Sequence, residues 1–185
     1  GELQLKGQKS RQRQGKGPVV VCEDSSGSMD GPKQQWTKAL VLALATYAKV
    51  QKRSFGWIMF DWVVQQSQVW LKGLLMARDM LRIAQATSGG GTNFENPLRR
   101  AFEMIRKEGL HHADILLLTD GISGVSDTFI EELKTVKKAL DVHVYTVLMD
   151  VGEATSKTVE SFSDKVVLVS EFTAEEASRK VISLL

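Results

Sequence analysis

Short apolar runs alternate with longer amphipathic segments from Pro18 to the end of the chain. Strands buried on both faces of a sheet read as continuous apolar runs, and amphipathic segments between them are typical of helices that cover the sheet. Five apolar runs predict buried strands, at residues 19–22, 57–60, 115–118, 144–148 and 166–169. The pattern therefore predicts an α/β domain with a doubly wound, mostly parallel sheet and helices on both faces.

A sixth strand is predicted where the chain has no room for a crossover helix. The stretch between Phe60 and Leu71 is shorter than a crossover between parallel strands requires. Residues 63–71 are therefore expected to turn back as an antiparallel strand at the sheet edge, with Asp61 and Trp62 in the hairpin turn. The predicted architecture is Rossmann-like with one antiparallel edge strand.

Apolar residues at three- and four-residue steps predict the helices between the strands. The first helix is expected to begin near Pro32, because proline is favoured at the first helical position. The same spacing predicts helices around residues 98–105, 129–140 and 174–184, and shorter ones at 76–86 and 155–162. The four tryptophans are expected to serve core or edge packing; they are Trp36, Trp57, Trp62 and Trp70.

The composition is that of one globular domain. Of the 185 residues, 43% are hydrophobic and 25% are charged, which argues against disorder or a fibre. No apolar run approaches the ~20 residues that span a bilayer, and the polar N-terminus lacks the apolar core of a signal peptide. The single cysteine, Cys22, is expected to be a buried structural thiol. These features predict a soluble domain in a reducing, cytoplasmic setting.

Residues 1–17 differ from the rest of the chain in charge. They contain one acid, Glu2, and five basic residues, namely Lys6, Lys9, Arg11, Arg13 and Lys16. This segment offers little apolar area to offset the entropy cost of ordering, so we expect a flexible arm or linker before a domain at residues 18–185. It has no aromatic residue for base stacking, which disfavours nucleic acid as its partner. The start at Gly1 rather than Met suggests a fragment of a longer protein.

Three oxygen-bearing side chains alternate directly after the first predicted strand. They are Asp24, Ser26 and Ser28, with Gly27 between the serines. In an extended segment, residues two apart point the same way, so these side chains can converge. In a doubly wound sheet, ligands bind beyond the carboxyl ends of the strands, near the point where the strand order reverses. The loop is therefore expected on the rim of a binding site.

Two further segments should reach the same rim, each with one oxygen ligand. Thr92 follows a run of three glycines before a predicted helix, and Asp120 follows the strand at 115–118. Carboxylates combined with neutral hydroxyls suit a small hard cation that retains waters, which is the behaviour of Mg²⁺. Zinc or copper would favour histidine and cysteine.

Other polar residues near these segments have simpler interpretations. Glu23 and Asp30 flank the first loop and are expected to be solvated surface acids. The three histidines are His111, His112 and His143; they are expected to lie on the surface without forming an imidazole cluster.

The combination of Asp-x-Ser-x-Ser, a distant Thr after glycines and Thr-Asp-Gly after a later strand resembles the metal-ion-dependent adhesion site (MIDAS) of von Willebrand factor A (VWA) domains. The likeness covers roughly residues 18–185. It implies that a metal ion is held, directly or through water, by Asp24, Ser26, Ser28, Thr92 and Asp120. It also implies that an acidic residue of a partner protein completes the coordination. The expected ion is Mg²⁺, with Mn²⁺ or Ca²⁺ as alternatives.

A closer resemblance is to bacterial intracellular VWA proteins of the CoxE and ViaA type. It rests on residues 17–22, Gly-Pro-Val-Val-Val-Cys, and residues 89–94, Gly-Gly-Gly-Thr-Asn-Phe. In those proteins the VWA domain ends a longer chain and works with a MoxR-type AAA+ ATPase, so such an ATPase is the implied partner. Asn93 stands where many relatives carry Asp and is expected to lower the charge around the ion.

The leading hypothesis is thus a Mg²⁺-dependent protein-protein interaction module, not an enzyme. A Mg²⁺-dependent hydrolase is a second hypothesis, because an Asp at a strand end beside a metal also suits hydrolysis. The sequence has no Walker phosphate loop, and neither Ser26 nor Ser28 has an identifiable histidine to activate it. A scaffold in an RNA-protein assembly, with the basic arm as the contact, is a third hypothesis.

Overall fold

The computed structural model describes residues 16–121, 123–149, 153–169 and 174–185. The expected flexible arm falls mostly on residues 1–15, which lie outside the described residues. At the start of the described chain, the Lys16 ammonium donates a hydrogen bond to the Tyr47 hydroxyl (2.9 Å), and the Gly17 carbonyl accepts one from Arg53.

Six strands form one sheet in the order β3-β2-β1-β4-β5-β6. The sheet is parallel except for β3, which pairs antiparallel with β2 at the edge. The strands are β1 (Val19–Asp24), β2 (Phe55–Phe60), β3 (Val64–Trp70), β4 (Asp114–Thr119), β5 (His143–Leu148) and β6 (Lys165–Leu168). The expected mostly parallel, Rossmann-like sheet with one antiparallel edge strand is confirmed.

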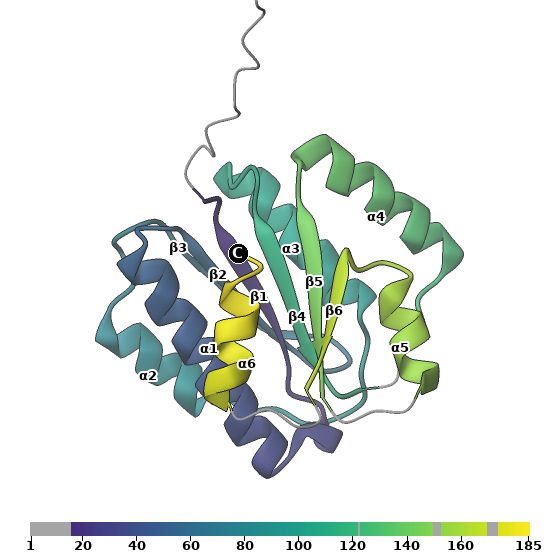
Figure 1. The fold of residues 1–185 in the computed structure, drawn as a ribbon, viewed down its shortest axis with the longest axis horizontal. Helices are drawn as coiled ribbons and strands as arrows, with labels where there is room; N and C mark the ends of the chain where they lie inside the picture. Colours follow the sequence, from purple (N-terminus) through teal and green to yellow (C-terminus); the bar gives the residue numbers. More distant parts are fainter. Residues whose placement is uncertain (1–15, 122, 150–152, 170–173) are drawn as a thin grey trace, which may run out of the picture.

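Helices cover both faces of this sheet (Figure 1). They are α1 (Pro32–Val50), α2 (Ala77–Gln85), α3 (Glu95–Glu108), α4 (Asp127–Leu140), α5 (Glu153–Glu160) and α6 (Ala174–Ile182), and a short 3-10 turn, η1, spans Gly27–Met29. The first helix begins at Pro32, as expected; the preceding Gly31 has a φ of 85°, which only glycine adopts without strain. Each predicted helix is present. None within the described ranges has the length and apolarity to cross a membrane.

The alternation of side chains along the strands divides the core into two layers. Val19 and Val21 of β1 pack in the layer that also contains residues of α1, α2 and α6. Val20 and Cys22 point the other way, into the layer that contains residues of α3, α4 and α5. The expectation of a buried Cys22 is confirmed, and burial raises the pKa of its thiol.

The hairpin between β2 and β3 turns at Asp61 and Trp62, as expected, but one tryptophan prediction is wrong. Trp57 is fully buried, and Trp36 and Trp70 are partly buried against the core. Trp62 is 62% exposed, because it lies in the turn of the hairpin rather than in a strand.

The prediction that Glu23 is a solvated surface acid is also wrong. Strand β1 continues through Asp24, so Glu23 is still inside the sheet and only 1% exposed. Its carboxylate accepts a hydrogen bond from the Trp57 indole N–H (2.8 Å) and forms an ion pair with the Lys38 ammonium of α1 (2.8 Å). Burial raises the pKa of Glu23, although Lys38 opposes the shift. Asp30 is exposed, as expected.

We expect Lys38→Met to destabilise the protein by about 3–5 kcal/mol, because it leaves the buried Glu23 carboxylate without its cation. Glu23→Gln in the same chain should restore most of that loss. The free energy of unfolding, measured by urea titration, checks both variants. The Lys38→Met deficit should shrink as pH falls, since the raised pKa lets Glu23 become neutral in the folded state. An equal loss in the single and double variants would contradict the ion-pair explanation.

Candidate metal centre

The candidate site lies where the strand order reverses. Strands β1 and β4 are neighbours in the sheet, and the chain proceeds from β1 toward one edge and from β4 toward the other. The loops that follow these two strands therefore diverge at their carboxyl ends, which is where ligands bind in open α/β sheets. In Figure 1 this rim is at the lower end of the sheet, beside the start of α1.

The loop after β1 brings its three predicted ligands together. One carboxylate oxygen of Asp24, Oδ1, accepts a hydrogen bond from the Ser26 backbone N–H (2.9 Å), and the Oγ atoms of Ser26 and Ser28 lie 3.2 Å apart. The expected extended path is only partly correct, because Gly27–Met29 form the 3-10 turn η1. The convergence of the two serine hydroxyls therefore comes from a turn rather than from strand alternation.

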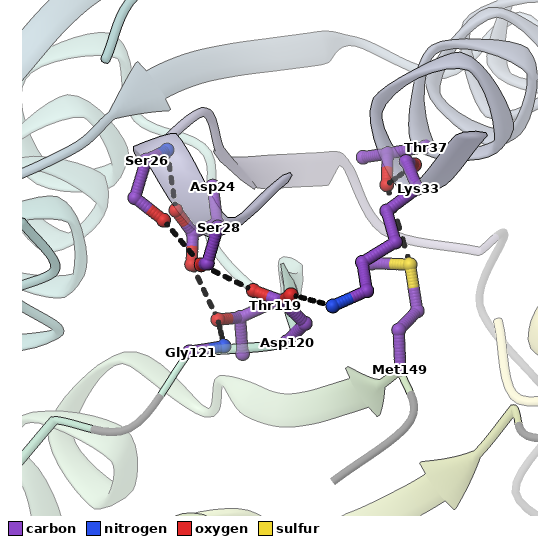
Figure 2. A network of polar contacts seen from close by, with 9 residues as sticks. All are labelled: Asp24, Ser26, Ser28, Lys33, Thr37, Thr119, Asp120, Gly121 and Met149. Carbon is purple, nitrogen blue, oxygen red and sulfur yellow. Dashed lines mark hydrogen bonds and ion pairs between the residues drawn. The ribbon is translucent and has the colours of Figure 1, made fainter. Parts of the chain in front are cut away.

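The loop after β4 joins this cluster through two residues. Asp120 Oδ1 accepts a hydrogen bond from the Ser28 hydroxyl (2.9 Å). The fully buried Thr119 donates its hydroxyl to Asp24 Oδ2 (2.5 Å) and accepts the Gly121 backbone N–H (2.8 Å). Figure 2 shows the contacts that join the two loops, Ser28 with Asp120 and Thr119 with Asp24. Sequence reasoning missed Thr119, although the Thr-Asp-Gly motif contains it.

The third loop places Thr92 at the same point. A Cβ atom on Gly121 would lie 2.9 Å from Thr92 Oγ1 and 3.1 Å from Asp24 Oδ2, so both oxygens border the space that the glycine leaves open. The loop is tied to the first one by the Gly27 backbone N–H, which donates to the Gly90 carbonyl (3.0 Å). All five predicted metal residues are therefore gathered at one rim.

Two polar residues beside the site have structural roles that the sequence did not reveal. The Ser25 hydroxyl accepts the Ser88 backbone N–H (3.0 Å), and the Ser88 hydroxyl donates to the Ser25 carbonyl (3.1 Å), which fixes the third loop to the first. The Asn93 side chain accepts the Asn96 backbone N–H (3.0 Å) at the start of α3. Asn93 therefore caps a free N–H group of that helix.

Lys33 is the cation of the cluster, and sequence reasoning missed it as well. Its ammonium lies 2.5 Å from Asp120 Oδ2, the oxygen that Ser28 does not occupy (Figure 2). The Asp120 side chain is only 2% exposed, whereas the Lys33 side chain is 38% exposed. A long side chain from the first turn of α1 thus reaches across the rim.

The electrostatics of the site suit a hard cation. Burial raises the pKa of Asp24, although hydrogen bonds from Thr119 and Ser26 oppose the shift. A bound cation would offset this cost of burying charge. The donors are carboxylate and hydroxyl oxygens, and the described part of the chain has no group of three or more His, Cys, Asp or Glu placed to hold a metal. Oxygen donors of this kind are those that hard divalent cations prefer, and the Lys33 ammonium on Asp120 shows that the rim accepts positive charge.

The histidines lie at the other end of the sheet. His143 is the first residue of β5, and His111 and His112 precede β4, so all three are at amino ends of parallel strands. They are exposed, as expected.

Comparison with known proteins places the chain in a family. The family described as VWA domain containing CoxE-like protein matches residues 3–178. An uncharacterised protein of Methanocaldococcus jannaschii is 34% identical over 165 residues, which are 89% of this chain and 37% of that protein. The chain spans about two fifths of the length of the curated relatives that it matches.

Solved structures agree on the fold. Proximal thread matrix protein 1 from the mussel byssus, with a zinc-occupied MIDAS motif, has a TM-score of 0.70 and 19% identity, covering 91% of this chain and 46% of that one. A von Willebrand factor type A structure from Catenulispora acidiphila has a TM-score of 0.67 and 15% identity, covering 90% of this chain and 42% of that one. The matching family, the fold and the arrangement of the rim lead to one conclusion: the chain is a VWA domain and belongs to the CoxE-like family.

Proposed function

We propose that this VWA domain binds a partner protein through a Mg²⁺ ion held by Asp24, Ser26, Ser28, Thr92 and Asp120. The observation that carries the proposal is the meeting of these oxygens from three loops at the switch point of the sheet. The zinc-occupied MIDAS of the mussel protein supports a divalent metal at this place in the fold. In this chain the oxygen-only donor set favours Mg²⁺, with Mn²⁺ or Ca²⁺ as alternatives.

The chemistry of the donors identifies the partner's contribution. Asp24 and Asp120 supply two negative charges, whereas the three hydroxyls are neutral, so a bound divalent ion keeps its affinity for a further anionic oxygen. A carboxylate of an Asp or Glu on the partner's surface provides that oxygen. The ion would then act as a bridge between two proteins.

The same geometry supports an interaction module in preference to a hydrolase. An activated serine nucleophile needs a general base within hydrogen-bond reach. Ser26 bonds only to Ser28 among these groups, and Ser28 donates to Asp120, whose carboxylate is already paired with the Lys33 ammonium and is therefore a weak base. All three histidines lie at the opposite end of the sheet. No observation within the described residues favours the RNA-scaffold hypothesis over protein binding.

A MoxR-type AAA+ ATPase is our proposal for the partner, and the support for it is membership of the CoxE-like family. Because the matched relatives are more than twice as long as the chain, we also propose that the domain functions as part of a longer protein. A cytoplasmic setting would suit both proposals.

Trp62 extends the proposed interface beyond the ion. Its exposed indole lies against Gly91, the residue before Thr92, and its carbonyl accepts a hydrogen bond from the Asn96 side chain (2.9 Å). The backbone is therefore fixed while the ring remains available. Tryptophans of this kind are enriched among the residues that dominate interface energies.

We expect Asp120→Ala to weaken Mg²⁺ binding by more than about 100-fold. Loss of a group that only supports a ligand already costs about 10–100-fold. Calorimetric titration of Mg²⁺ measures this. Asp30→Ala is the matched control, since it removes an exposed acid from the same rim and should change little. Capture of a AAA+ ATPase from native extract should require Mg²⁺, stop with EDTA and be lost in Asp120→Ala. Chelator-resistant capture by that variant would falsify the metal bridge.

The pH dependence should have opposite signs with and without Mg²⁺. The pKa of Asp24 lies above its ordinary value of 3.8 in the folded protein. Its contribution to the stability of the metal-free protein therefore falls as pH rises above 3.8 and the buried carboxyl group loses its proton. Mg²⁺ needs the carboxylate form, so the rise in Tm that it causes should grow as pH rises above 3.8 and Asp24 loses its proton. Thermal unfolding across this range measures both trends. An equal Mg²⁺ effect at all pH values would argue against Asp24 as a ligand.

Trp62→Ala should weaken partner binding by about 2 kcal/mol or more, the threshold for a residue that dominates an interface. Its Mg²⁺ affinity should stay at the wild-type value, because the indole supplies no ligand. Val50→Ala is the control, an exposed apolar residue at the far end of α1. Calorimetry with Mg²⁺ and binding assays with the captured partner separate the two effects. If Trp62→Ala and Val50→Ala bind the partner equally well, Trp62 is outside the interface.

A further inference from the structure

Lys33 occupies an electrostatically unusual position. It is the second residue of α1, where the helix dipole disfavours a cation, and the first turn contains no acidic residue. The ammonium nevertheless reaches Asp120 Oδ2 at 2.5 Å. Its charge is thus directed at a candidate metal ligand rather than at its own helix.

The backbone of Lys33 is held in place for this contact. The Thr37 hydroxyl donates to the Lys33 carbonyl (2.8 Å) and also lies 3.3 Å from the Met149 sulfur, just beyond β5 (Figure 2). Met149 in turn donates its backbone N–H to the Thr119 carbonyl (2.9 Å), next to Asp120. The start of α1 and the loop after β4 are therefore linked, and the lysine side chain spans the short distance between them.

The two partners of this ion pair differ in access to water. The Asp120 side chain is buried and its other oxygen accepts the Ser28 hydroxyl, whereas the Lys33 side chain is 38% exposed. Asp120 therefore cannot leave without losing several contacts. The ammonium can move out and become hydrated by rotation of a flexible stem.

We propose that Lys33 is a tethered internal cation of the metal site. It neutralises Asp120 while no divalent ion is bound, competes with the ion for that carboxylate, and is released when the ion binds. The inference rests on the proposed function and adds a regulatory residue to it. Asp24, Asp120 and Lys33 together carry one negative charge, so a divalent ion meets a weaker attraction than the two acids alone would exert.

Release of Lys33 also defines how the partner is recognised. The freed ammonium stays tethered to the first turn of α1, beside the carboxylate that a partner offers to the ion. It can pair with that carboxylate and so return to an anionic partner. Metal binding and partner binding are then coupled, because the partner's acid stabilises the displaced position of the lysine.

Calorimetric titration with Mg²⁺ alone, and with Mn²⁺ alone, tests the competition without any partner. Lys33→Met should bind Mg²⁺ at least about tenfold more tightly than the wild-type chain, because the competing charge is gone. Lys33→Arg keeps the charge and should stay within about threefold of wild type. Lys49→Met is the matched control, since it removes one exposed charge from the far end of the same helix.

Thermal unfolding supplies a second readout. Metal-free Lys33→Met should unfold at a lower temperature than wild type, because the buried Asp120 loses its cation, and Mg²⁺ should raise its Tm by more than it raises that of wild type. A Lys49→Met variant should show neither change.

Each outcome decides the matter. The role of Lys33 is overturned if Lys33→Met binds Mg²⁺ with wild-type affinity. It is also overturned if Lys33→Arg or Lys49→Met tightens Mg²⁺ binding as much as Lys33→Met does. Both results leave the proposed function intact. If Lys33→Met binds Mg²⁺ and the wild-type chain does not, the proposal is supported in its strongest form, because the lysine then excludes the ion from Asp120. Absence of divalent binding in both proteins overturns the proposed metal site and this inference with it.

Discussion

The burial of two carboxylates at the ends of adjacent parallel strands is the constraint on which the site depends. Asp24 is the last residue of β1 and Asp120 comes directly after β4, and both are almost inaccessible to solvent. Removing a charged group from water is costly unless hydrogen bonds or an opposite charge compensate. Around Asp24 the compensation is a set of neutral donors, from the Ser26 backbone and the Thr119 hydroxyl. The carboxylate is held in place, yet its charge is not cancelled.

Glu23, the acid next to Asp24, shows how a buried carboxylate can be neutralised permanently. Glu23 and Asp24 are consecutive residues of β1 and therefore point to opposite faces of the sheet. Glu23 faces α1, where Lys38 and Trp57 satisfy it inside the core. Asp24 faces the rim and receives no cation from the described chain. Burial alone therefore does not distinguish the two acids; the counter-ion fixed beside Glu23 does.

Most of the fold could be predicted from the sequence because it depends on local patterns. The apolar runs gave the strands, and the spacing of oxygen-bearing residues after two of them indicated which side chains would meet. Glu23 was misjudged because the apolar run ends at Cys22 while the strand continues to Asp24. Lys33 could not be found from the sequence, since its contact with Asp120 joins residues 87 positions apart and depends on how α1 lies over the sheet. Trp62 was expected in the core or at its edge because tryptophan is large and apolar, and its exposure results from its place in the hairpin turn.

Helix α1 supplies a cation to each of two buried acids, Lys38 to Glu23 and Lys33 to Asp120. Lys38 projects into the core and its side chain is 11% exposed, whereas Lys33 lies at the rim and is 38% exposed. Breaking the Lys38 pair would bury one ammonium and one carboxylate without partners, so that pair stays closed in the folded protein. The Lys33 ammonium has water within reach when it leaves, so opening its ion pair strands only the Asp120 carboxylate, which a divalent ion would neutralise in turn. One helix thus fixes one acid permanently and leaves the other open to exchange, and the difference in exposure of the two lysines decides which is which.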